Sequence, residues 1–296
     1  MPAGGAEGDP AAVSGTPVGG PVPEGGDALA PGAQGAGAPA ARPRRRLRAA
    51  LRWTAAVAVF AAVGTLTAYG ITRMERTDVP GLATESDGRW DYPTLAYPPM
   101  PSGSPGPLAE DNPAGTHHAD LRALVLPAPK GATEDKALRG EDGWLATKDF
   151  LAQFPEKTHR AEFGQFLTDY GLRHIAARGW TTEDGTETRV YLLRFATSAV
   201  VQELTPGRIA PAGGPAYPVR GDNLSEFDNE YAEAVKPLPD VSRYVYAEMK
   251  PYGAQQVRQA YVTAGDVLAL IVQSRKGKAL AVPFQQTVTL QSQLLS

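Results

Sequence analysis

An uncharged run of twenty residues, from Trp53 to Thr72, constrains this chain more than any other feature of its sequence. At about 1.5 Å of rise per residue, a helix of this length reaches roughly 30 Å, the thickness of the hydrocarbon core of a bilayer. The sequence therefore predicts a transmembrane helix over residues 53–72, with the lipid bilayer as its partner. Two pairs of small residues spaced four apart, Ala58 with Ala62 and Gly64 with Ala68, also allow this helix to form a homodimer.

The charges on either side of the run predict its orientation. Six arginines precede it, namely Arg42, Arg44, Arg45, Arg46, Arg48 and Arg52. On the far side, two arginines are matched by two acidic residues, namely Arg73, Arg76, Glu75 and Asp78. Because arginine-rich flanks stay in the cytoplasm, we expect a single-pass plasma membrane protein with a cytoplasmic amino terminus and an extracytoplasmic domain.

Cleavage of the run as a signal peptide is the alternative to an anchor. Ala68-Tyr69-Gly70 has small residues at the two positions that a signal peptidase requires. The 52 residues that precede the run are far more than the usual amino-terminal part of a signal peptide, and they favour retention as an anchor.

Two segments rich in Gly and Pro flank the predicted helix. Residues 1–52 form the cytoplasmic tail, and its first 41 residues contain no aromatic side chain, so they bury too little apolar surface to fold and are expected to be disordered. Residues 73–117 carry prolines at intervals that neither a helix nor a strand ladder tolerates, which predicts an extended linker. The aromatic residues of the linker, namely Trp90, Tyr92 and Tyr97, either dock on the domain, contact the lipid interface or bind a partner.

Residues 118–296 are expected to form one α+β domain, an antiparallel sheet with helices packed on one of its faces. The elements that the patterns predict are an edge element at 123–127, helices over 143–154, 156–170 and 198–204, strands over 172–181, 187–195, 243–249, 255–263 and 267–273, and a terminal helix from Pro283. The strands at 189–195 and 267–272 are apolar at both alternating sets of positions, which indicates central strands covered on both sides.

Composition excludes several classes of function. The net formal charge is +2 before Trp53, −4 over residues 73–117 and −1 over residues 118–296, so no basic face for nucleic acid is expected. Cysteine is absent, which excludes disulfides and thiolate zinc sites. We expect no bound cofactor.

Two groups of residues contain side chains that can act as metal ligands. His117, His118 and Asp120 could bind zinc or copper, but no third ligand stands at a recognised spacing, and a solvated junction between linker and domain is favoured. A second group offers oxygen ligands to calcium in a loop without the required glycine and terminal glutamate, so a solvated acidic loop is favoured; it comprises Asp222, Glu226, Asp228 and Glu230.

Motifs for catalysis are missing from the sequence. There is no Gly-x-Ser-x-Gly elbow and no glycine-rich phosphate loop with a lysine. His159 and His174 lie on a predicted helix and strand and are expected at the surface or paired in the core. No residue is assigned a catalytic role, and an envelope hydrolase stays open as the alternative function.

Four tyrosines form the one candidate binding face, namely Tyr244, Tyr246, Tyr252 and Tyr261. Tyr244 and Tyr246 alternate onto one face of a predicted strand, where tyrosine gives contact area to a ligand or partner at a low entropic cost. Packing of the same side chains against the terminal helix is the competing interpretation.

The layout of tail, arginine cluster, single crossing, proline-rich linker and α+β domain resembles the single-pass membrane proteins of actinobacteria. Residues 118–296 are similar in outline to the extracytoplasmic sensor domains of actinobacterial serine/threonine kinases, although those domains carry disulfides and this chain has no kinase domain. The resemblance implies a membrane-anchored binding or protein-interaction module of the cell envelope, whose partner is an envelope protein or ligand.

Overall fold

The computed structural model describes residues 43–73 and 86–296, and the side chains of residues 47–70 and 86–296. The chain divides into two compact units, Met1–Glu75 and Arg76–Ser296. The tail predicted to be disordered, over residues 1–42, and the part of the predicted linker at 74–85 lie outside the described residues.

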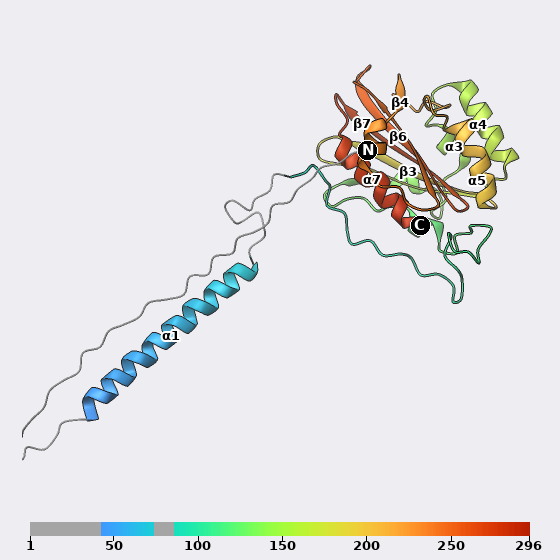
Figure 1. Cartoon of the computed structure of the whole chain (residues 1–296). Helices are drawn as coiled ribbons and strands as arrows, with labels where there is room; N and C mark the ends of the chain where they lie inside the picture. Colours follow the sequence, from blue (N-terminus) through green and yellow to red (C-terminus); the bar gives the residue numbers. More distant parts are fainter. Residues whose placement is uncertain (1–42, 74–85) are drawn as a thin grey trace, which may run out of the picture. The chain divides into compact units, whose positions relative to one another are not determined.

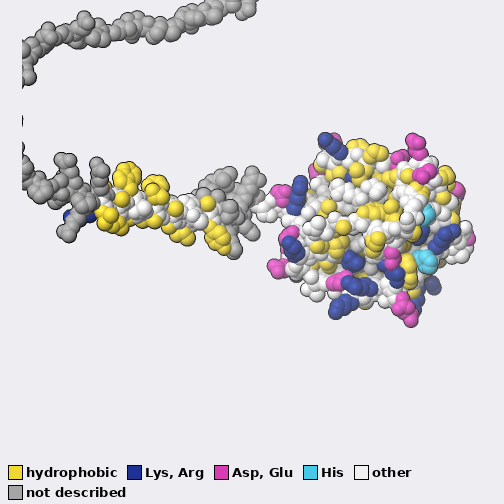
Figure 2. All heavy atoms as spheres, turned by 90° about the horizontal axis from the view of Figure 1, so that it is seen from below, with side chains coloured by type: hydrophobic (Ala, Val, Ile, Leu, Met, Phe, Trp, Pro, Cys, Tyr) yellow, Lys and Arg dark blue, Asp and Glu magenta, His cyan; other side chains and the backbone are white. Residues whose placement is uncertain are grey.

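The first unit contains one long helix, α1, from Pro43 to Arg73 (Figure 1). Its segment Leu47–Gly70 is long and apolar enough to span a membrane, and Figure 2 shows the hydrophobic side chains along it. Three hydroxyls in this segment donate to the carbonyl oxygen four residues earlier, which satisfies them within the helix, namely those of Thr54, Thr65 and Thr67. The prediction of a membrane-length helix is confirmed, although the same length and composition also fit a signal sequence.

The second unit is built on a seven-stranded sheet in which all neighbouring strands are antiparallel. The strands lie in the order β1-β2-β3-β7-β6-β5-β4. Their bounds are Thr133–Asp135 (β1), His174–Thr181 (β2), Glu187–Arg194 (β3), Ser225–Phe227 (β4), Val241–Glu248 (β5), Gln255–Ala264 (β6) and Val267–Lys276 (β7). The two predicted hairpins are β2–β3 and β6–β7. Their turns use Gly185 and Gly265 at φ values of 79° and 49°, which glycine adopts at little steric cost.

Both faces of this sheet are buried. Successive residues of β7 alternate between two hydrophobic cores, with Leu268 and Leu270 in one and Ala269 and Ile271 in the other. The first core is covered by α3 (Thr147–Leu151), α4 (Lys157–Asp169) and α5 (Ser198–Leu204), and the second by α2 (Leu121–Leu124) and α7 (Ala281–Leu294). Figure 1 shows α7 on one side of the sheet and α3 to α5 on the other. The α+β class is confirmed. The prediction that helices pack on only one face of the sheet was wrong, because apolar central strands need a cover on each face.

Two local predictions were also wrong. The apolar run at 123–127 does not form an edge element, because α2 begins just before it, with the Asp120 side chain accepting from the Arg122 N–H as a cap. The helix predicted over 143–154 is only the five residues of α3. A 3₁₀ turn, η2 (Lys136–Arg139), a π turn, η3 (Thr205–Ile209), and a short helix, α6 (Asn229–Ala234), complete the fold.

The second half of the predicted linker packs on α7, and we call residues 90–117 the strap. The Trp90 N–H donates to Gln286 Oε1 at 2.8 Å, and Gln286 Nε2 donates to the Trp90 carbonyl at 2.9 Å. The Tyr92 and Thr287 hydroxyls lie 2.9 Å apart. Of the three interpretations of the linker aromatics, docking on the domain holds for Trp90 and Tyr92. The folded unit therefore includes residues that the sequence placed in a linker ending at residue 117.

The strap ends in a buried polar contact that we call the His117 clasp, formed by His117, Asp266 and Arg194. His117 is fully buried, with Nδ1 2.7 Å from Asp266 Oδ1 and Nε2 3.0 Å from the Leu295 carbonyl oxygen. The imidazole ring thus bridges a carboxylate and a backbone carbonyl, two groups that accept hydrogen bonds. Arg194 completes the clasp by donating to Asp266 Oδ2 at 3.1 Å and to the His117 carbonyl at 2.6 Å. The predicted solvated junction was therefore wrong for His117, whereas His118 and Asp120 are exposed.

We predict that the clasp contributes strongly to stability. The fragment 86–296 suits the measurement, because both cores are built from its residues alone. His117→Ala removes the imidazole that bridges the buried Asp266 carboxylate and the Leu295 carbonyl and leaves a cavity in its place, so the free energy of unfolding should fall by about 3 kcal/mol in urea titration. His118→Ala, at the exposed neighbouring position, should change it by less than about 0.5 kcal/mol. Equal effects of the two substitutions would contradict a stabilising clasp.

Candidate functional site

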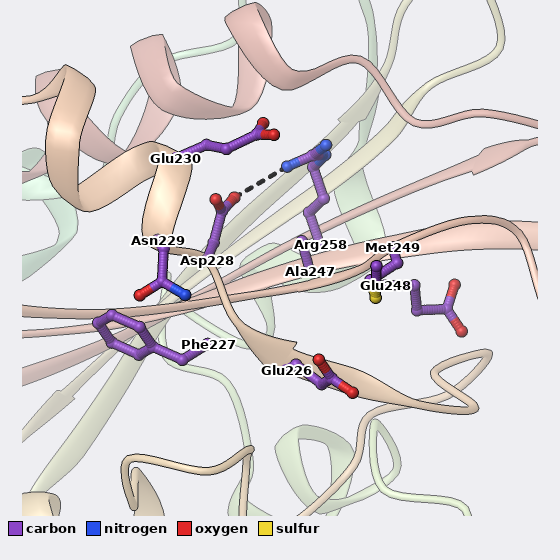
Figure 3. Close-up of a pocket in the computed structure, with 9 residues that line it drawn as sticks. All are labelled: Glu226, Phe227, Asp228, Asn229, Glu230, Ala247, Glu248, Met249 and Arg258. Atoms are coloured by element: carbon purple, nitrogen blue, oxygen red, sulfur yellow. Dashed lines mark hydrogen bonds and ion pairs between the residues drawn. The ribbon is translucent and has the colours of Figure 1, made fainter.

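A pocket of about 300 Å³ lies at the β4 edge of the sheet (Figure 3). It is lined by the end of β4, the start of α6, the end of β5 and one residue of β6, namely Glu226, Phe227, Asp228, Asn229, Glu230, Ala247, Glu248, Met249 and Arg258. We call it the β4 pocket. No other pocket of the described residues gathers as many charged side chains around one buried ion pair.

Strand register explains why this edge is hollow. Ala247 on β5 is the partner of Glu226 on β4 and also of Arg258 on β6, so the three residues form one row across three strands. Directly paired residues of antiparallel strands point to the same face of a sheet. The middle member of the row is an alanine, and its short side chain leaves a gap between two long ones. Ala247 is therefore the floor of the β4 pocket.

The walls of the pocket are fixed by the buried pair of Asp228 and Arg258. Asp228 caps α6 by accepting from the Tyr231 N–H at 3.0 Å, and its own N–H donates to the Val245 carbonyl at 2.8 Å. Its second carboxylate oxygen lies 3.0 Å from Arg258 Nη1, and both side chains are about nine-tenths buried. Figure 3 shows the two side chains pointing toward each other.

Arg258 has spare hydrogen-bonding capacity. A guanidinium offers five N–H donors, and the pair with Asp228 uses one of them. Nε of Arg258 is buried and has no hydrogen-bond partner among the described residues. A buried donor without a partner is costly, so an acceptor supplied by a ligand would be favoured here.

The electrostatic balance of the β4 pocket is acidic. Its lining residues include four acids and one arginine, a formal charge of −3, and the Glu248 side chain points to the opposite face of the sheet from Ala247. Glu248 is buried and accepts the N–H groups of Asn223 and Val257 at 2.9 and 3.0 Å. Glu226 and Glu230 are exposed, and neither forms an ion pair within the described part of the chain. The two free carboxylates attract a positively charged group.

The structure separates the residues of the candidate calcium site. Asp228 is committed to Arg258, and Asp222 accepts from Gln259 Nε2 at 3.2 Å. Across residues 43–73 and 86–296, no group of three or more His, Asp or Glu side chains is placed to hold a metal ion. A fully solvated acidic loop was also wrong, because Asp228 is buried and Asp222 is half-buried.

The four candidate tyrosines do not form one exposed face. Tyr246 and Tyr261 are fully buried in the core under α3 to α5, where the Tyr246 hydroxyl donates to the Pro211 carbonyl at 2.7 Å. Burial raises the pKa of both phenols. Tyr244 packs partly buried against the same core, and Tyr252 is exposed in the β5–β6 turn. The competing interpretation, core packing, holds for three of them, but on the face opposite α7.

The histidines considered for catalysis stand apart from the pockets. His174 stacks on Trp144 with ring centroids 4.6 Å apart, and His159 lies edge-on to Tyr217 at 5.7 Å. Neither lines the β4 pocket or the four other pockets described for residues 86–296.

Sequence reasoning missed Arg258 and Ala247. Arg258 interrupts β6, whose other residues are nearly all buried, and a charge inside such a strand signals a buried partner. Ala247 carries no signal of its own, because its role depends on two neighbours from other strands. Comparison with known proteins finds no family model and no curated sequence that matches this chain.

We predict that Asp222→Asn stabilises the folded unit at neutral pH. Burial and, to a smaller extent, the nearby charge of Glu248 raise the pKa of Asp222, and one of its carboxylate oxygens is buried without a partner. An acid with a raised pKa in the folded state contributes stability below its unfolded pKa of about 3.9, and that contribution is lost as the pH rises through the folded pKa. The amide should therefore add about 1 kcal/mol at neutral pH.

Urea unfolding of fragment 86–296 at several pH values checks this sign. The gain from Asp222→Asn should shrink steadily toward about pH 4, because the carboxyl of the unsubstituted protein becomes protonated. Asp111→Asn, at an exposed position, is the matched control and should show no such trend. A gain that grows on acidification would contradict the raised pKa.

Proposed function

We propose that this chain is a membrane-anchored binding module of the cell envelope, whose exterior domain binds a positively charged group in the β4 pocket. The observation that carries the proposal is a concave site in which two unpaired carboxylates surround a buried guanidinium with a free N–H. Ligand sites combine a concavity with a few polar groups that are placed by rigid elements. Here the elements are three hydrogen-bonded strands and a capped helix.

The chemistry of the pocket selects a ligand with two features. An ammonium or guanidinium group pairs with Glu226 and Glu230, and a carbonyl or carboxylate oxygen accepts from Arg258. A peptide with a basic side chain supplies both groups within one residue. The pocket lining contains no Ser, Thr or His, so it offers neither the hydroxyl nucleophile nor the imidazole base of a serine-type hydrolase.

The membrane location rests on α1. An apolar helix of this length after an arginine cluster supports an anchor with a cytoplasmic amino terminus. The folded unit is then extracytoplasmic, as the resemblance to envelope sensor domains implies.

Binding of a basic residue is tested with a matched pair of probes. Acetyl-lysine-amide carries one ammonium and two carbonyls, and acetyl-norleucine-amide is nearly the same shape without the charge. In titrations of fragment 86–296 followed by amide NMR, the lysine probe should shift the resonances of the residues that line the β4 pocket. Its affinity should fall when salt is added. The norleucine probe should bind at least about tenfold more weakly.

Variants of the pocket floor complete this test. Ala247→Leu fills the pocket and should reduce affinity for the lysine probe by at least about tenfold. Ala234→Leu, on the exposed surface of α6 outside the lining, should leave binding unchanged. Equal binding of the two probes, or shifts that survive Ala247→Leu, would refute the proposed site.

Retention of the anchor is tested by the intact mass of the protein. We expect the chain recovered from membranes to contain α1, because the long segment before it is atypical of a signal peptide. A mature protein that begins at Ile71 would contradict the anchor and leave the β4 pocket unaffected.

A further inference from the structure

Three large apolar side chains stand exposed together at one end of the sheet. They are Leu224, Met249 and Tyr252, with exposed fractions of 53, 79 and 41%, and we call them the apolar tip. Ser225 pairs with Glu248, which places Leu224 next to Met249. Tyr252 lies in the turn that joins β5 to β6. The other large apolar side chains of the sheet region are mostly in the two cores, so this cluster calls for a separate explanation.

Three lysines lie at the same end of the sheet as the apolar tip. Lys250 lies in the same turn, with its ammonium 5.5 Å from the centre of the Tyr252 ring. Lys276 is the strand partner of Gln255, the first residue of β6, and Lys278 follows two positions later. All three lysines are exposed. Glu226 of the β4 pocket is the exposed acid on the neighbouring strand.

We propose that the apolar tip inserts into the surface of an anionic lipid bilayer. Exposed apolar and aromatic side chains ringed by lysines are typical of segments that lie at a membrane interface, where the rings and stems enter the headgroup region and the ammonium groups contact phosphates. The inference uses the anchoring part of the proposed function, since a spanning helix holds the domain near lipid. It does not depend on a ligand in the β4 pocket.

The length of chain before the strap supports lipid as the occupant. Sixteen residues separate Arg73, the last residue of α1, from Trp90, the first strap residue bonded to α7. Trp90 binds Gln286 in the first half of α7, and α7 follows directly on Lys278. The chain from the anchor thus enters the folded unit at the end of the sheet that bears the apolar tip.

A protein partner is less well suited to this surface. A stable protein interface buries about 800 Å² on each side and centres on a packed apolar patch. The apolar tip is three side chains on a turn, which is small for such an interface. Insertion of a few side chains into a bilayer needs no complementary surface.

The experiment uses fragment 86–296, which lacks α1, and vesicles of equimolar phosphatidylcholine and phosphatidylglycerol. The chain has no cysteine, so Leu224→Cys carries a polarity-sensitive dye at one defined position. We expect the dye emission to shift to the blue on these vesicles and the fragment to float with them. Ala161→Cys, exposed on α4, carries the control dye and should not shift.

Variants separate the apolar and ionic contributions. Leu224→Ser with Tyr252→Ser should lower the partition coefficient at least about tenfold, and neither position lines the β4 pocket. Each of Lys250→Gln, Lys276→Gln and Lys278→Gln should lower it by about fivefold at low salt. These variants should still bind the lysine probe, which distinguishes a failure of the tip from a failure of the pocket.

Two outcomes would overturn the proposal. The first is the absence of flotation and of a dye shift on the anionic vesicles, or a partition coefficient that the double serine variant leaves unchanged. The second is self-association of the fragment without lipid, seen in sedimentation together with a blue shift at position 224, because the tip would then be an interface between copies of this chain.

Discussion

The central strands β3 and β7 are apolar on both of their faces, and the rest of the folded unit follows from that constraint. A sheet with two apolar faces is stable in water only if each face is covered. Helices α3 to α5 supply one cover. The second needs more than α7 alone, and α2 and the strap complete it. The strap is therefore part of the core and not a spacer, despite its prolines.

The His117 clasp shows how this cover is fastened. It joins the end of the strap to the β6–β7 turn and to the last carbonyl groups of α7, three places that are far apart in the sequence. A buried imidazole, carboxylate and guanidinium are costly to desolvate one by one, but each satisfies another here. The β4 pocket also contains a buried ion pair, but Asp228 accepts only one of the hydrogen bonds that Arg258 can donate, and Arg258 Nε has no partner. A satisfied buried network stabilises a fold, and an incompletely satisfied one favours a ligand.

Much of the fold could be predicted because its signals are local. The Asp184-Gly185 turn, the alternation in β3 and β7 and the α4 helix that ends at Gly171 each lie within about fifteen residues. The site was harder to predict, because the β4 pocket depends on Glu226, Ala247 and Arg258 meeting across three strands. Tyr244 and Tyr246 do share one strand face, but nothing local shows that this face is covered by α3 to α5.

The sequence by itself determined the membrane-length helix, the asymmetry of charge around it, the α+β class and the two hairpins. These features follow from the length of the apolar run, the charges that flank it and the spacing of apolar residues along each segment. Only the tertiary structure decided that residues 90–117 fold back on α7, that His117 is buried and that Ala247 opens a pocket. Each of these outcomes depends on contacts between residues more than one hundred positions apart or on strands brought together by register. Such contacts are selected by the packing of the whole sheet, which no single segment encodes.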